Sequence, residues 1–315
     1  MQLIRSIFSH KIDQASDLTD GVVATIGNFD GVHLGHQTVL SKIANHSGKT
    51  KLPSMVIAFE PSANEFFLKD NAPPRLTNFR EKFSLIDKLG INYFVCLHFN
   101  RELANMPAEE FIEKILVKTL RIKHLMVGDN FRFGKDRKGD FKLLQHYADK
   151  LGYKVEDTQS FESNGKRVSS SLIREFLDKG ELEQAKIMLG RDYSISGRVV
   201  HGDEKGRTIG FPTANIPIKR KSCAVSGVYA VKVLTQDGNE YYGVANIGHR
   251  PTVGGTRTQL EVHIFKFSQE IYGDFLTVTF SKKLRDEKKF DSFDELKNQI
   301  MHDSQSAQDY FCITA

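Results

Sequence analysis

The stretch from Gly27 to Gln37, Gly-Asn-Phe-Asp-Gly-Val-His-Leu-Gly-His-Gln, constrains what this chain can fold into more than any other. An apolar, β-branched run typical of a buried strand precedes it at residues 21–26, and residues 38–43 have the apolar spacing of a helix. A glycine-bearing loop between a strand and a helix suits phosphate, because the first amides of the helix lack internal partners and its dipole attracts anions. We therefore predict a phosphate-binding loop.

Two histidines, His33 and His36, stand three residues apart at the predicted helix start and therefore on one face. Their imidazoles can donate to the same phosphate oxygen. Zinc ligation is one alternative, but no third ligand stands at a usable spacing. A plain turn with two ordinary surface histidines is the other, and it leaves the concentration of glycine and aspartate in the loop unexplained.

Strand-like and helix-like segments alternate from Val22 to about Leu189. Asn78 with Glu81 has the pattern of a capping box, and Pro107 suits the first turn of another helix. The alternation predicts an α/β domain, a doubly wound parallel sheet with helices on both faces and right-handed crossovers. Further strands are expected at residues 54–59, 93–97, 124–127 and 154–155.

Two later segments of this half have the composition of ligand loops. Residues 127–140 combine glycines, Phe131, Phe133 and basic residues, which suits an aromatic phosphorylated ligand; an ordinary loop with both phenylalanines in the core is the alternative. Residues 169–174 place three serines at a helix start, which capping alone explains. Arg174 in the first turn is disfavoured by the helix dipole, so it indicates an anion.

Past Leu189, alternating apolar and polar segments with glycine-bearing turns predict an antiparallel sheet closed into a small barrel. Ser292 and Glu295 form a second capping-box pattern before a terminal helix. The boundary between the domains falls near residues 186–192. Barrel strands are expected at residues 194–201, 228–234, 241–245, 259–267 and 276–280. The apolar side of the terminal helix is expected to carry Phe293, Leu296 and Ile300.

The polar segment 202–215 is not a Walker A loop, because its glycines are one residue too close and Arg207 stands where lysine is required. Thr213 and Asn215 alternate along an extended stretch, so both face one way and can hold Mg²⁺ with a nucleotide. Glu261 alternates with apolar neighbours. Such an outward carboxylate is usually only solvated, but facing a ligand it can act as a general base.

Composition sets the broad class of the protein. The chain is 40% hydrophobic and 26% charged with a net charge of +5, a mild excess that helps to attract anions. No apolar run reaches the roughly 20 residues of a membrane span, and the start of the chain is too short and polar for a signal peptide. Cys96, Cys223 and Cys312 are few and scattered, which fits a reducing compartment, so we predict a cytoplasmic protein.

Four motifs together resemble those of the bacterial bifunctional riboflavin kinase/FAD synthetase family, in that family's order and spacing over nearly the whole chain. They are Gly27-Asn-Phe-Asp-Gly-Val-His-Leu-Gly-His36, Ser169-Ser-Ser-Leu-Ile-Arg174, Gly210-Phe-Pro-Thr-Ala-Asn215 and Leu284-Arg-Asp-Glu-Lys-Lys-Phe290. The resemblance implies an FMN adenylyltransferase over residues 1–186, which joins FMN to the AMP part of ATP, and a riboflavin kinase over residues 187–315. It implies Mg²⁺ as cofactor, ATP as co-substrate, riboflavin and FMN as substrates, and no nucleic-acid or membrane partner.

The resemblance also implies residue roles at the matching motif positions. His33 and His36 stabilise charge on the α-phosphate, Glu261 is the base for the ribityl hydroxyl, and Thr213 and Asn215 lie at the metal. The residues implied to bind ATP are Gly27, Asn28, Phe29, Asp30, Ser169, Ser170, Arg174, Gly206, Thr208, Gly210 and Pro212. Those implied to contact the flavin are Gly128, Asp129, Asn130, Phe131 and Arg285.

The chain departs from the family pattern in three places. Ser62 and Ala63 stand where many relatives carry histidine and proline, Ser171 replaces threonine, and His249 stands where a smaller residue is common. If that histidine serves adenylyl transfer elsewhere, its role here is either vacant or taken by another donor. Two competing hypotheses follow: an enzyme that keeps one activity and, from another class, an RNA- or nucleotide-binding module built on a small barrel with basic and aromatic residues.

Overall fold

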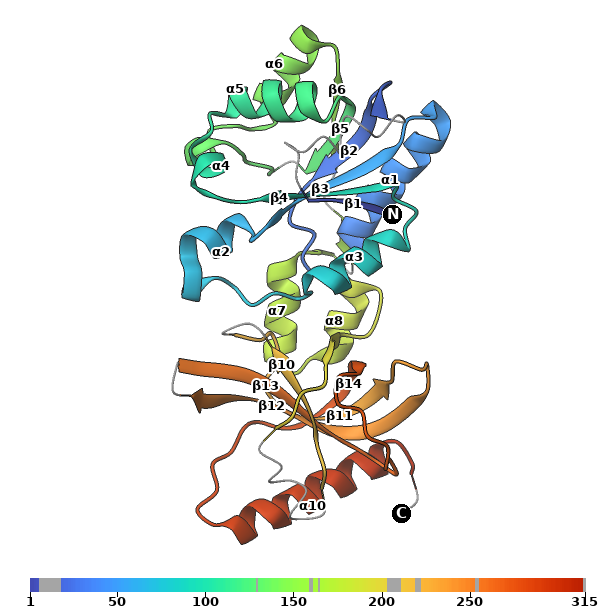
Figure 1. Cartoon of the computed structure of the whole chain (residues 1–315), viewed down its shortest axis with the longest axis vertical. Coiled ribbons are helices and arrows are strands. Elements are labelled where there is room, and N and C mark those ends of the chain that lie inside the picture. The colour runs from blue at the N-terminus through green and yellow to red at the C-terminus, as the bar shows by residue number, and fades with distance from the viewer. Residues whose placement is uncertain are drawn as a thin grey trace. The chain divides into compact units, whose positions relative to one another are not determined.

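The computed structural model divides the chain into two compact units, drawn with their helices and strands in Figure 1. The N-terminal unit comprises residues 1–73 and 77–169, and the C-terminal unit comprises residues 170–315 together with Pro74–Leu76. The structure describes residues 1–5, 18–128, 130–158, 161–163, 165–202, 211–218, 222–252 and 255–313, with the backbone alone over 249–252 and 255–257.

The N-terminal unit is built on a six-stranded sheet in the order β1-β4-β3-β2-β5-β6, in which every neighbouring pair is parallel. The predicted doubly wound parallel sheet is therefore confirmed, and all four further strands lie where the sequence indicated. The edge strand β1 was not predicted from its few residues. The strands are β1 (Gln2–Ile4), β2 (Val22–Ile26), β3 (Ser54–Glu60), β4 (Tyr93–His98), β5 (Ile122–Gly128) and β6 (Lys154–Thr158).

Helices cover both faces of this sheet (Figure 1). On one face Leu40 of α1 and Ile86 of α3 pack in a core cluster with Val23 of the central strand. On the other, Ile112 and Leu144 pack with alternate residues of the same strands, so β2 is buried along its whole length. The helices are α1 (Leu34–Thr50), α2 (Ala63–Leu68), η2 (Lys69–Asn71), α3 (Phe79–Asp87), α4 (Arg101–Asn105), α5 (Ala108–Glu110), η3 (Phe111–Thr119), η4 (Lys135–Arg137) and α6 (Phe141–Leu151). A short hairpin of β7 (Glu162–Ser163) and β8 (Lys166–Arg167) completes the unit.

Helix starts in this unit follow their capping residues. The capping box of Asn78 and Glu81 is present in full at α3, as predicted. Pro107, predicted in the first turn, instead precedes α5 as its N-cap, because its ψ of 149° is extended and helical geometry begins at Ala108. From Phe111 the same helix continues in π-helical form.

The C-terminal unit contains the predicted antiparallel barrel, with six strands in the order β10-β13-β12-β11-β14-β9. A single bridge between Val200 and Asn215 brings the two edges together, so the barrel is nearly closed. The strand expected at 194–201 ends at Arg198. The other four expected strands are present, but the one expected at 241–245 continues to residue 252, and the one expected at 259–267 begins at residue 255 and ends at 264. The strand at 214–218 was not predicted. The strands are β9 (Ser194–Arg198), β10 (Ala214–Ile218), β11 (Gly227–Leu234), β12 (Glu240–Thr252), β13 (Gly255–Ile264) and β14 (Phe275–Arg285), and the helices are α7 (Ser170–Asp178), α8 (Leu182–Leu189) and α10 (Phe293–Tyr310).

The terminal helix α10 differs in detail from expectation. Phe293 is 56% exposed, so its placement on the apolar face was wrong; the helix rests on the barrel through its second half, where Ala307 packs against Val228 and Phe265. The capping box is half formed. The Ser292 hydroxyl accepts from the Glu295 amide at 3.2 Å, but the Glu295 carboxylate accepts from the preceding amide, that of residue 291.

Candidate active sites

The predicted phosphate loop joins β2 to α1, and its two histidines pack against each other. His33 is the N-cap of α1, and its Nδ1 accepts from the His36 amide at 3.4 Å. The two rings stack with centroids 3.6 Å apart and planes 17° from parallel, which confirms that they share one face. His33 is only 6% exposed, so neither a solvated turn nor a pair of ordinary surface histidines describes this loop.

His36 is held neutral by its surroundings. Burial lowers the pKa of His36 well below 6.5, and the nearby His33 and Lys82 lower it further. Its Nδ1 is buried and has no hydrogen-bond partner among the described residues. A neutral imidazole can donate one hydrogen bond to an anion, but it brings no net charge.

The remaining residues of the loop are partly structural. Phe29 is 3% exposed and packs in the core, with its ring 5.2 Å from that of His36. Asp30 Oδ1 accepts from the Thr77 amide at 3.1 Å, and Thr77 Oγ1 accepts from the Gly31 amide at 3.0 Å. These bonds fasten the loop to the start of α3, whereas Asn28 is exposed.

The loop after β5 places its aromatic residues as the alternative interpretation foresaw. Phe133 is 6% exposed in the core, and Phe131 is half-buried and stacks on it with centroids 5.4 Å apart. The Phe131 amide donates to the Gly128 carbonyl at 3.0 Å, which makes a tight turn around Asn130. Asp129 lies outside the described residues.

An aromatic cluster that the sequence analysis missed follows β3 and β4. The rings of Phe59, Phe66, Phe67 and Phe99 meet edge to face at centroid distances of 5.2–5.8 Å. Phe67 is nevertheless 63% exposed, which is unusual for a large apolar side chain. The adjacent phenylalanines at 66 and 67 were the available signal.

Ser62, at the position of the departure from the family pattern, is the N-cap of α2. Its hydroxyl accepts from the Glu65 amide at 3.4 Å, and its own amide donates to the Glu65 carboxylate at 2.9 Å. This reciprocal pair is a capping box, so the serine has a local structural role.

The serine run begins α7 at Ser170, with Ser169 just before it, and Gly180 follows the helix end with φ of +76°. Arg174 is the fifth residue of the helix, and its Nε donates to the Pro74 carbonyl at 2.6 Å. That bond uses one of the five N–H donors of the guanidinium.

In the barrel, Asn215 and Glu261 are direct cross-strand partners of β10 and β13, so their side chains share one face. The predicted alternation is confirmed, since Leu260 and Val262 are fully buried while Glu261 is half-buried. Asn215 Oδ1 accepts from Gln259 Nε2 at 2.5 Å, and Asn215 Nδ2 donates to the Thr213 carbonyl. Gly206, Thr208 and Gly210 lie outside the described residues.

His263 fixes the segment before β10. Its Nδ1 lies 2.9 Å from the Pro212 carbonyl, which can only accept, so Nδ1 carries a proton. Burial lowers the pKa of His263 below 6.5, and the bond to Pro212 partly opposes this shift.

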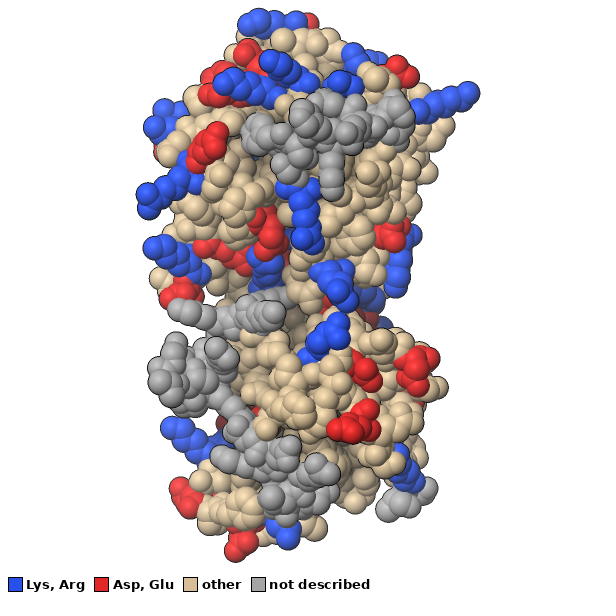
Figure 2. All heavy atoms as spheres, in the orientation of Figure 1, with Lys and Arg blue, Asp and Glu red and all other residues tan. Residues whose placement is uncertain are grey.

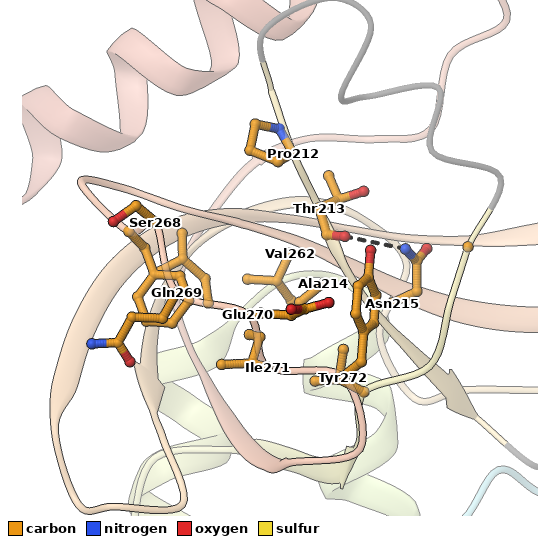
Figure 3. A pocket seen from close by; sticks show the side chains of 14 residues that line it. Pro212, Thr213, Ala214, Asn215, Val262, Ser268, Gln269, Glu270, Ile271 and Tyr272 are labelled. Carbon is orange, nitrogen blue, oxygen red and sulfur yellow. Dashed lines mark hydrogen bonds between the residues drawn. The ribbon is translucent and has the colours of Figure 1, made fainter.

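A cavity of about 460 Å³ opens beside these residues (Figure 3). Thr213, just before β10, and Asn215 on that strand line one side, while Glu270 and Tyr272 line it from the β13–β14 connection. The ring of His201 stacks on Tyr272 at 3.8 Å between centroids. The remaining lining residues are Val199, Gly202, Pro212, Ala214, Val262, Ile264, Phe267, Ser268, Gln269 and Ile271.

Arg285, predicted near the flavin, is engaged by α10. Its Nε donates to both carboxylate oxygens of Asp303 at 3.1 and 3.0 Å, and its Nη2 donates at 2.8 Å. Asp303 is 5% exposed and also accepts from Gln299 Nε2 at 2.9 Å. The guanidinium carbon lies 5.6 Å from the centroid of the Phe290 ring.

Neither the distribution of charged side chains nor that of metal-binding side chains indicates another site among the described residues. Figure 2 shows Lys and Arg side chains interspersed with Asp and Glu on the face in view. No group of three His, Cys, Asp or Glu side chains is arranged there to hold a metal ion. Within the same residues, no helix is both long and apolar enough to cross a bilayer.

Comparison with known proteins assigns both halves. The FAD synthetase family model matches residues 15–172, and the riboflavin kinase family model matches residues 189–311. The Escherichia coli (strain K12) bifunctional riboflavin kinase/FMN adenylyltransferase is 48% identical over 314 residues, which cover 100% of this chain and 99% of the relative. The chain belongs to this family.

Other members of the bifunctional riboflavin kinase/FMN adenylyltransferase family match at similar length. The Haemophilus influenzae protein is 45% identical with 99% of each chain covered, and the Pseudomonas fluorescens protein is 43% identical with 98% of this chain and 97% of its own covered. A crystal structure of a Streptococcus pneumoniae protein named macrolide-efflux protein aligns with a TM-score of 0.79 at 29% identity, covering 98% and 99%. The resemblance inferred from the four motifs is thus confirmed.

Proposed function

We propose that this chain makes FAD from riboflavin in two ATP-dependent steps, with FMN adenylyl transfer in residues 1–186 and riboflavin phosphorylation in residues 187–315. The observation that carries this division is the presence of two separate polar sites on two folds of one family member. One is the histidine loop at the start of α1, and the other is the β10–β13 face beside the barrel cavity.

In adenylyl transfer, a phosphate oxygen of FMN attacks the α-phosphorus of ATP. A P–O bond forms there, the bond to the β-phosphate oxygen breaks, and pyrophosphate leaves with the electron pair. Such a reaction depends on positioning and charge neutralisation. We assign to His33 and His36 the donation of hydrogen bonds to the α-phosphate, because their stacked rings lie on one face.

Further groups complete the proposed ATP and flavin contacts of this reaction. Gly27, Asn28, Phe29 and Asp30 are assigned to ATP as parts of the same loop, and Ser169, Ser170 and Arg174 are assigned to the departing phosphates. Gly128 to Phe131 are assigned to FMN. To these we add Phe67, because an exposed phenylalanine beside the carboxyl ends of parallel strands suits a flat aromatic ring.

In the kinase step, the ribityl hydroxyl attacks the γ-phosphorus of ATP. The bond between the γ-phosphorus and the β-phosphate oxygen breaks, and ADP leaves with the electron pair. Glu261 is assigned to take the hydroxyl proton, since a neutral hydroxyl is a weak nucleophile. The barrel cavity is assigned to ATP, with Pro212, Gly206, Thr208 and Gly210 on its polar segment. Arg285 is assigned to the flavin.

The proposed cofactor is Mg²⁺, and the donors present fit it. Thr213 and Asn215 offer neutral oxygens, which Mg²⁺ accepts together with phosphate oxygens. The Asn215 carbonyl accepts one hydrogen bond, from Gln259, and an amide oxygen has a second lone pair. When bound, the ion would neutralise charge on the transferring phosphates. We also propose a cytoplasmic location and no nucleic-acid or membrane partner.

The test is to incubate the full chain with riboflavin, ATP and Mg²⁺ and to separate the flavins. His36→Ala should stop FAD while FMN still accumulates, and Glu261→Gln should stop FMN from riboflavin while added FMN is still converted to FAD. His146→Ala and Glu240→Gln, both exposed, are the matched controls. Equal loss of both products from either site variant would refute the division of labour, and absence of both products with the unaltered chain would refute the function.

A further inference from the structure

A buried lysine on α3 has no assigned part in either reaction. Lys82 is 5% exposed, and it forms the buried face of α3 with Ile86 one turn later. Ile86 packs in the core cluster that also holds Val32 of the phosphate loop and Leu40 of α1. Lys82, one turn closer to the start of α3, is therefore on the side of the sheet where α1 begins.

The start of α3 is fastened to the phosphate loop. Thr77 donates from its amide to Asp30 Oδ1 at 3.1 Å and accepts at Oγ1 from the Gly31 amide at 3.0 Å, and Asn78 caps the helix immediately afterwards. These contacts fix the first turns of α3 relative to the loop. Consistent with this placement, the charge of Lys82 contributes to the lowered pKa of His36, after burial and His33.

A neutral His36 limits the positive charge at this site. The His36 ring stacks on His33, and burial disfavours its charged form, so His36 offers a hydrogen bond more readily than a charge. A triphosphate brings several negative charges, and its reaction is accelerated mainly by preorganised positive groups. A lysine held by a packed helix supplies a charge that does not need to reorganise.

We propose that Lys82, buried on the inner face of α3, whose start is bonded to the phosphate loop, is a positioning residue for adenylyl transfer that supplies fixed positive charge to that loop. This inference rests on the proposed adenylyltransferase function. Lys82 acts on the polyphosphate through its field, and it adds to the burial and the His33 charge that favour the neutral, hydrogen-bonding form of His36.

The experiment compares Lys82→Met, which keeps the aliphatic length, with Lys82→Arg and with Lys88→Met, an exposed lysine at the end of the same helix. All are made in the full chain and assayed for FAD from FMN, ATP and Mg²⁺. Lys82→Met should lower kcat/KM by about 10- to 100-fold, the loss typical of one charged hydrogen-bonding group. Lys82→Arg should recover part of it, and Lys88→Met should match the unaltered chain. Riboflavin phosphorylation by the same samples should not change.

The pH profile separates this role from a merely structural one. The charged groups that act on His36 are His33 in the loop and Lys82 on α3, while Asp30 of the same loop is bonded to Thr77. Removing the Lys82 charge should raise the pKa of His36. The pH below which kcat/KM falls, the acidic limb of the profile, should therefore move to a higher value, and the midpoint of the His36 titration followed by NMR should move in the same direction. A structural effect would lower the rate without moving the limb.

The outcomes are distinguishable. If the unaltered chain makes no FAD from FMN, the proposed function is wrong. If the unaltered chain does make FAD, and folded Lys82→Met shows the same kcat/KM and the same pH profile as that chain, the role proposed for Lys82 is wrong. Should circular dichroism show Lys82→Met to be unfolded, Lys82→Gln takes its place, and a folded Lys82→Gln with an unchanged profile overturns the proposal equally.

Discussion

The pair formed by Arg285 and Asp303 gives the sharpest stability prediction, with Asp303→Asn as the perturbation. This change keeps the volume of the side chain and removes its charge. Three contacts of 2.8–3.1 Å join the guanidinium to the carboxylate, and Gln299 donates a fourth contact at 2.9 Å. Asparagine would place an amide donor against this all-donor environment.

The magnitude follows from burial. Removing one partner of a buried ion pair costs about 3–5 kcal/mol, because the other charge is left without compensation. The Asp303 side chain is 6% exposed, but that of Arg285 is 23% exposed and can regain some hydration. We therefore expect a loss of about 2–3 kcal/mol in the free energy of unfolding of the C-terminal unit, or roughly 5–10 °C in its melting temperature.

The assay is thermal and urea unfolding of the full chain followed by circular dichroism, with riboflavin phosphorylation measured in parallel. Asp309→Asn is the matched control, since Asp309 lies on the same helix and also accepts from a glutamine four residues away, Gln305 at 2.8 Å, but is exposed. The control should change stability by less than about 0.5 kcal/mol. If Asp303→Asn destabilises no more than Asp309→Asn, the reasoning from burial is refuted.

Three further predictions concern pH, a close approach and the exposed aromatic cluster. Burial lowers the pKa of His124 in the folded state, so the unfolded state binds a proton at this histidine more readily. The N-terminal unit should therefore be fully stable above about pH 6.5 and lose stability as the pH falls towards 5. In urea unfolding at several pH values, His124→Asn should flatten that dependence. Gly202→Ala would place a methyl group against the amide of Asn215, which lines the barrel cavity, and should weaken riboflavin phosphorylation. The control Gly48→Ala, in open space on α1, should leave that activity unchanged and raise the free energy of unfolding by about 0.5–1 kcal/mol. Equal kinase activity in both variants would contradict the geometry. Phe67→Ala should raise KM for FMN in FAD formation, while the similarly exposed Phe293→Ala should not, and the same KM in both would remove Phe67 from the flavin site.

Local chemistry determined much of this protein from its sequence alone. The alternation of apolar runs gave the parallel sheet and the barrel, the Asn78–Glu81 pair gave a helix start, and the spacing of His33 and His36 put both rings on one face. Each of these features depends on residues a few positions apart, whose relative directions are set by the period of a helix or strand. The wrong prediction for Phe293 shows what local patterns leave open. Apolar spacing along a helix predicts which face is buried, but not which part of the helix length contacts the barrel.

Only the tertiary structure decided which distant groups meet. The bonds from Thr77 to Asp30 join residues 47 apart, and the contact between Gln259 and Asn215 joins residues 44 apart. No local pattern identifies such pairs, because they depend on how strands are ordered and how helices pack across the sheet. The burial of Lys82 was equally invisible, since a lysine at that spacing is ordinarily solvated. The sequence therefore determined the two folds and the positions of their polar loops, and packing determined which charges surround those loops.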